Sequence, residues 1–159
     1  MGPQGPQGEQ GPPASLALAA ATFFSTDTAS VPPNVPIPLN SGSRIEGLGL
    51  YLLNATDVRI DNPGVYLVSY YFQGDPVDGI ETLSCCLRVN GNTVPGSIVQ
   101  SVTSPEANIV EPSVSNTCLL PIEAPGALLQ LFNTSGTAIS HLRWVAGFCG
   151  ASLTLFRIR

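Results

Sequence analysis

The sequence predicts an all-β domain, a sandwich or barrel of short strands, behind a short collagen-like N-terminal segment. Roughly eight to ten apolar runs alternate with turns rich in Gly, Pro and Asn, and no amphipathic helix stands among them. Glycine occupies every third position at the start of the chain. Charged residues make up only 11% of the chain, against about 25% in typical soluble domains.

Residues 1–13 follow the collagen pattern. Four successive triplets begin with glycine, and the other triplet positions hold only Pro, Gln and Glu. Only glycine fits at the crowded axis of a triple helix, and proline presets the polyproline II backbone of each strand. A flexible Pro/Gly-rich linker is the alternative interpretation. Because four triplets are too few to hold a triple helix alone, we interpret them as the end of a longer stalk, with residues 14–159 as the head.

The first part of the head predicts two strands around a proline-rich connection. Alanine-rich residues allow a helix, but the β character of the rest favours a strand from Leu18 to Phe24. Four prolines between Thr26 and Asn40 exclude a helix or a central strand and indicate an extended segment. The run from Ser43 to Leu53 follows, and two glycines inside it suggest a bulge or a close backbone approach.

The middle of the chain carries the clearest strand and hairpin signals. A type II turn is expected at Asn62–Val65, and the strand Val65–Gln73 after it has apolar or aromatic groups on both faces. The next strand, Thr82–Val89, ends at Asn90-Gly91, the strongest short-range hairpin signal. Its partner is expected from about Thr93 to Val102, interrupted by Pro-Gly. The remaining expected strands are Ser115–Leu120, Ala127–Phe132, Ile139–Val145 and Ala151–Ile158.

One of these strands carries a family motif. The stretch from Gly64 to Tyr70 reads GVYLVSY, and Asn62-Pro63 precedes it. It resembles the Gly-x-Tyr-x-Phe-x-Tyr strand of the complement globular-head and tumour necrosis factor (TNF) superfamily, with Val68 where Phe is usual. The hairpin after Val89 resembles that of the bacterial branch, the heads of collagen-like glycoproteins on the spore exosporium. The closing strand Ser152–Phe156 is similar to the apolar last strand of the superfamily. The proline-rich segment and four cysteines depart from that branch.

The resemblance implies a ten-stranded jelly-roll β-sandwich and a tight, bell-shaped homotrimer. Alternate side chains of the aromatic strand would fill the core or face a neighbouring protomer. The residues expected in the core or trimer contact are Tyr66, Val68, Tyr70, Phe72, Leu153 and Leu155. Tyr71 belongs to the same aromatic cluster, for which a sugar-binding platform is the alternative.

Two functions follow from the resemblance and the stalk. The first is a structural trimerising head that nucleates and caps a collagen-like stalk on a bacterial or spore surface. The alternative is an adhesin or receptor-binding head that recognises a host protein or glycan, or a phage tail-fibre tip. Either would place the protein outside the cell or on its surface.

Composition and motifs argue against other classes of protein. The net charge of −5 does not suit a nucleic-acid partner. No run of about 18 apolar residues is present, so no membrane insertion is expected. The single histidine, His141, follows Ser140, but neighbours on a strand point to opposite faces and cannot form a nucleophile–base pair. We therefore predict no enzyme activity.

Two groups of residues leave questions open. Cys85, Cys86, Cys118 and Cys149 lack the spacing of a zinc site and allow either buried free thiols or disulfides in one of three connectivities. On the strand, Cys85 is expected to face the core and Cys86 the other side. Three acids crowd one loop, and some heads of the superfamily hold calcium near the trimer apex, so a calcium site is a hypothesis beside a solvated turn. These acids are Asp75, Asp78 and Glu81. No other cofactor is expected.

Overall fold

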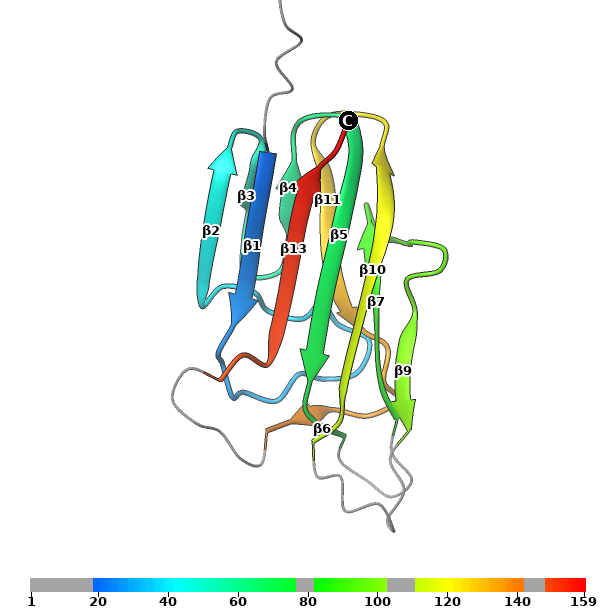
Figure 1. Cartoon of the computed structure of the whole chain (residues 1–159). Coiled ribbons are helices and arrows are strands. Elements are labelled where there is room, and N and C mark those ends of the chain that lie inside the picture. Colours follow the sequence, from blue (N-terminus) through cyan, green and yellow to red (C-terminus); the bar gives the residue numbers. More distant parts are fainter. Residues whose placement is uncertain (1–18, 77–81, 103–110, 142–147) are drawn as a thin grey trace, which may run out of the picture.

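The computed structural model describes residues 19–76, 82–102, 111–141 and 148–159. These residues form an all-β sandwich in which two main sheets pack face to face (Figure 1). The predicted all-β fold class is therefore confirmed. Three predictions lie wholly or partly outside the described residues. These are the collagen-like triplets, the loop acids Asp78 and Glu81, and residues 142–145 of the predicted strand Ile139–Val145.

The front sheet in Figure 1 contains five antiparallel strands in the order β10-β5-β13-β1-β2. Their bounds are β1 Ala19–Ser25, β2 Gly42–Gly47, β5 Gly64–Gln73, β10 Ser113–Ile122 and β13 Ala151–Arg157. The strands predicted at the places of β1, β5, β10 and β13 are confirmed with small shifts of their ends. Strand β5 pairs with β10 on one side and with β13 on the other over most of its length, so the aromatic strand is an interior strand of the sheet.

The back sheet has the order β3-β4-β11-β7-β8, and β9 also pairs with β7. The bounds are β3 Leu50–Leu52, β4 Val58–Ile60, β7 Thr82–Val89, β8 Asn92–Thr93, β9 Val99–Val102 and β11 Ala127–Asn133. Two short strands, β6 (Asp75–Pro76) and β12 (Ile139–Ser140), form a small sheet at one end of the sandwich (Figure 1). Strand β4 was not predicted, because three residues are too few for an alternating pattern to be visible.

Glycine geometry corrects two local predictions. The expected single strand Ser43–Leu53 is two strands in two different sheets, because Gly47 and Gly49 adopt φ values of 83° and 86° and turn the chain from the front sheet to the back. Gly64 does not form the expected type II turn. It is the first residue of β5, at a φ of 155°, where an added side chain would run into the backbone carbonyl of Arg159.

The Asn90-Gly91 hairpin is confirmed. Both residues have positive φ, 50° and 81°, as a tight two-residue hairpin turn requires. Val89 then pairs with Asn92, which starts the short strand β8. After the expected interruption at Pro95-Gly96, β9 returns to the first half of β7.

The proline-rich segment is extended, as predicted, and backbone hydrogen bonds attach it to β12 of the small sheet and to β11 of the back sheet. The Val31 and Ile139 backbones bond to each other, and the Ile37 amide donates to the Leu131 carbonyl at 2.8 Å. The buried amide of Asn133 donates to the carbonyl oxygens of Val31 and Pro32. Its prolines lack the N–H donors of a regular strand, so the proline-rich segment is held by hydrogen bonds at a few of its other positions.

The core lies between the two sheets. All six residues predicted for the core or the trimer contact point into it, with at most 2% of each exposed. Tyr66 also donates its hydroxyl to the Asn62 carbonyl at 2.7 Å, and Tyr70 donates to the Ser97 carbonyl. The start of β1 and the C-terminus lie at the same end of the sandwich, and β6 and β12 lie at the opposite end (Figure 1).

Candidate functional site

The outward face of the front sheet carries no charged side chain on four of its five strands. Strand alternation decides which residues lie there, because the alternate residues of each strand point toward the core and are mostly buried. The outward residues are Ala20, Thr22 and Phe24 on β1, Leu67, Ser69, Tyr71 and Gln73 on β5, Ser113, Ser115, Thr117, Leu119 and Pro121 on β10, and Ser152, Thr154 and Phe156 on β13. We call this surface the uncharged face. Charge returns only on the edge strand β2, at Arg44 and Glu46.

One row across the uncharged face is apolar. The strand register aligns Leu119 with Leu67, Leu67 with Phe156, and Phe156 with Ala20. Leu119 is 59% exposed, Phe156 42% and Leu67 39%. Three large apolar side chains on neighbouring strands make a continuous patch rather than scattered exposures, and such a patch marks a surface that another molecule covers.

The next row consists of hydroxyl groups. Thr117, Ser69, Thr154 and Thr22 follow one another across the four strands. Ser69 Oγ and Thr117 Oγ1 are 2.8 Å apart, and Thr22 Oγ1 and Thr154 Oγ1 are 3.0 Å apart, so each pair shares a hydrogen bond. Because these hydroxyls bond to each other, the row can lose water at a lower cost than unpaired polar groups.

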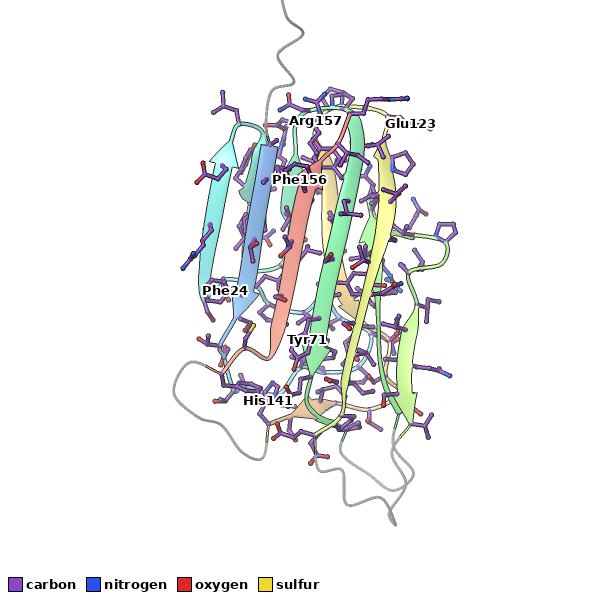
Figure 2. The ribbon with its side chains drawn as sticks, viewed as in Figure 1. Phe24, Tyr71, Glu123, His141, Phe156 and Arg157 are labelled. Carbon is purple, nitrogen blue, oxygen red and sulfur yellow. The ribbon has the colours of Figure 1, made fainter. Side chains whose placement is uncertain are left out.

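A third row adds two aromatic rings. Ser115 lies beside Tyr71, and Tyr71 beside Ser152. Burial raises the pKa of Tyr71, whose hydroxyl bonds to Gln73 Oε1. Phe24 on β1 is half-buried, and its ring lies where a side chain at Gly42 would be. Figure 2 shows Phe24, Tyr71 and Phe156 spread along the same sheet.

Chemically, this arrangement suits contact with another protein surface. It offers apolar area, internally bonded hydroxyls and no charge to desolvate. The six residues predicted for the core or the trimer contact are all in the core, whereas Leu67, Leu119 and Phe156, which were not predicted as contact residues, lie outside. Alternation within GVYLVSYYFQ divides the strand into two sets of side chains, one for each face. It does not tell which of the two sets faces the core.

The four cysteines are free thiols in this structure. Cys85 faces the core, as predicted, and burial raises the pKa of its thiol to about 12. Cys86 is on the other side of β7 and is also fully buried, beside Phe132, over whose ring Arg88 stacks at 3.4 Å. Burial also raises the pKa of Cys86, Cys118 and Cys149. Because the thiolate is the nucleophilic form, a raised pKa disfavours reactivity at these positions.

The remaining candidates do not assemble into a site among the described residues. Asp75 belongs to β6, but its two predicted calcium partners lie outside the described part of the chain. The calcium hypothesis stays a prediction, which titration calorimetry with calcium would test. Ser140 Oγ bonds to the Asp75 carbonyl, and the ring of His141 packs against Phe148 instead.

The described residues offer no metal-binding cluster and no membrane-spanning helix. No group of three or more His, Cys, Asp or Glu side chains is placed there to hold a metal ion. Nor do those residues contain a helix with the length and apolar character that crossing a membrane requires.

Comparisons with known proteins agree with the fold. No family model and no curated sequence matches the chain. The structure is similar to that of Eiger TNF from S. frugiperda, with a TM-score of 0.65 at 17% identity over 91% of this chain and 94% of that chain. It is also similar to murine APRIL, with a TM-score of 0.61 at 14% identity over 89% of this chain and 99% of that chain. The chain therefore has the jelly-roll fold of the TNF type.

Proposed function

We propose that the chain is a trimerising head that nucleates and caps a collagen-like stalk on a bacterial or spore surface, of the exosporium glycoprotein type. The uncharged face is the observation that carries this proposal. An exposed face with three large apolar side chains and no charge is costly to leave in water, and a second copy of the same chain supplies matching apolar surface.

A closed trimer requires two different contact patches on each protomer, because a ring is built from head-to-tail contacts. The uncharged face is one patch. A second is available at the sandwich edge, where β9 lies beside β10 (Figure 1). Ile98 and Val102 are each 60% exposed there. The face of one protomer meeting the edge of the next would bury both patches and close a ring of three.

The position of the chain ends agrees with a stalk. The first described strand begins at Ala19, six residues after the last triplet residue Pro13, and is paired on both sides within the front sheet. In a trimer built on this sheet, the three copies of β1 would start at the same end of the assembly. Holding three chains together in register lowers the entropic cost of starting a triple helix.

The test is the solution mass of the full chain, measured by light scattering over a dilution series. A trimer is expected, at about three times the 16.6 kDa of one chain. The matched measurement uses a chain that starts at Ala14, which is expected to keep the trimer because the head supplies the contacts. A monomer or a dimer for the full chain contradicts the proposal.

A recognition function for a host protein or glycan is the second candidate. A second exposed apolar group surrounds β3, away from the uncharged face. Leu48 is 84% exposed, Leu53 50% and Tyr51 38%. An adhesin would bind on a glycan or protein array and lose the signal in a Leu48→Ser, Leu53→Ser variant. A purely structural head would bind nothing there.

A further inference from the structure

The sandwich edge beside the uncharged face carries two grooves of different chemistry. One groove, of about 230 Å³, lies between the short strand β8 and the C-terminal end of β10, and we call it the apolar groove. The other, of about 340 Å³, lies between β9 and the start of β10, and we call it the polar groove. The lining residues include Val94, Pro95, Leu120 and Pro121 in the apolar groove and Gln100, Ser101, Ser113 and Ser115 in the polar groove.

The two grooves lie at different levels along the strands. Leu120 lines the apolar groove and Val114 lines the polar groove, and both belong to β10. These residues are six positions apart, which is roughly 20 Å at the rise of a β-strand. A side chain of a second molecule that enters one groove therefore does not reach the other.

Strand pairing carries both levels across the uncharged face. At the level of the apolar groove, Leu119 pairs with Leu67, which belongs to the apolar row. At the level of the polar groove, Ser115 pairs with Tyr71, and Tyr71 pairs with Ser152. The apolar row of the face is thus level with the apolar groove of the edge, and the row of Tyr71 is level with the polar groove.

A third level carries opposite charges. Glu123 follows β10 on the edge and is exposed, and Arg157 is the last residue of β13. Figure 2 shows both residues at the end of the sandwich opposite His141. Neither side chain forms an ion pair with another described residue, and Arg157 donates only to the Pro63 carbonyl, at 2.6 Å. The edge therefore offers an acid at the level where β13 offers a base.

Cyclic symmetry decides which levels can meet. Rotation about an axis leaves the position of every atom along that axis unchanged, so in a ring of three each level of one protomer faces the same level of the next. The start of β1 and the C-terminus lie at one end of the sandwich (Figure 1). Three chains that leave this end together toward a stalk place the symmetry axis along the length of the sandwich. Equal levels then bring together groups of matching polarity and opposite charge, which favours this register over a shifted one.

We propose that the two grooves are the docking sites for the uncharged face of a second copy of this chain, in a fixed register. The apolar row of one protomer, with Leu67 and Phe156, packs into the apolar groove at Val94 of the next protomer. The row of Tyr71 packs against the polar groove, and Arg157 lies level with Glu123 of the next protomer. This inference rests on the proposed trimer and adds to it which residues of the two copies meet.

The experiment places two cysteines in each full chain, one on the face and one on the edge, and treats the chain with a short bismaleimide crosslinker. The matched variants are Leu67→Cys with Val94→Cys, and Ser152→Cys with Gln100→Cys. The crossed variants are Leu67→Cys with Gln100→Cys, and Ser152→Cys with Val94→Cys. Denaturing electrophoresis is expected to show a covalent trimer for each matched variant. Each crossed variant is expected to give at least about tenfold less, because a linker that cannot span two sites joins almost none of them.

Light scattering of every chain before crosslinking separates this inference from the proposed function. A monomeric parent chain contradicts the trimer itself. Trimeric variants that crosslink equally in matched and crossed pairs, only in crossed pairs, or in no pair contradict the register alone. The parent chain, with its four free thiols, is the blank. If Val94→Cys fails to fold, the two Gln100→Cys chains still decide, because only the one with Ser152→Cys should crosslink.

Discussion

Replacing Phe156 by alanine separates trimer contact from folding. Phe156 is 42% exposed in the single chain. With about 200 Å² for an aromatic side chain, roughly 80 Å² of it is available for burial, worth about 2 kcal/mol at 25 cal/mol/Å². Three copies per trimer give about 6 kcal/mol, or about 10⁴-fold in the trimer association constant.

The matched control is Leu153→Ala on the same strand. Leu153 points inward and is 0% exposed, so its loss leaves a cavity in the core of each protomer. That change is expected to cost about 2–5 kcal/mol of folding free energy. Phe156→Ala removes a side chain that lies outside the core and is 42% exposed in the monomer, so it is expected to cost clearly less monomer stability than Leu153→Ala.

Two assays distinguish these effects. Light scattering over a dilution series measures the trimer, and urea unfolding of samples diluted until they are monomeric measures the protomer. The reasoning is refuted if Phe156→Ala keeps its trimer at the same dilution as the parent chain. It is also refuted if the monomeric Phe156→Ala chain loses as much urea stability as Leu153→Ala, because Phe156 would then belong to the core.

Three further changes test local features. Burial lowers the pKa of His141, with opposing contributions from Glu111 and Asp27. The unfolded chain therefore binds more protons than the folded one, and the free energy of unfolding falls as the pH drops below about 6.5. The melting temperature of His141→Phe should fall less between pH 7 and pH 5 than that of the parent chain. Gly91→Ala forces alanine to a φ of 81° and should lower the free energy of unfolding by about 1–2 kcal/mol. The control is Gly136→Ala, where the added methyl group meets open space. This control should leave the free energy of unfolding in urea unchanged or raise it slightly. Asn133→Ala removes the hydrogen-bond donor of two carbonyl groups in the proline-rich segment. It should lower the free energy of unfolding by about 1–3 kcal/mol in urea unfolding. An unchanged urea midpoint would show that these two hydrogen bonds do not hold the segment in place.

Much of the fold could be predicted from local chemistry. Asn90-Gly91 identified its hairpin because those two residues tolerate the positive φ of the turn. The strand Thr82–Val89 was placed to the residue, and Cys85 was assigned to the core by alternation. The break between β2 and β3 was not predicted, because two glycines with positive φ are compatible with a bulge inside one sheet and with a crossing between two.

The candidate site shows the same division. Alternation in β5 divides its residues into two sets, but both sets contain aromatic and apolar side chains, so pattern alone did not separate core from surface. The cavity between the proline-rich segment and the start of β13 could not be predicted either, because its lining residues are as far apart in sequence as Val31 and Ala151. His141 was noticed in the sequence only as a possible catalyst, whereas the structure places it in the cavity wall.

By itself, the sequence determined that the chain is built of strands, where its turns lie, and that its N-terminus repeats glycine every third residue. Those properties depend on the backbone preferences of single residues and on the spacing of apolar residues, and both are decided by residues that are close together in the sequence. Only the tertiary structure decided that Leu67, Leu119 and Phe156 form one apolar row and that Tyr66 belongs to the core. The reason is that pairing order and sheet packing are set by contacts between residues far apart in the chain, and the periodicity of a single strand is the same for either face.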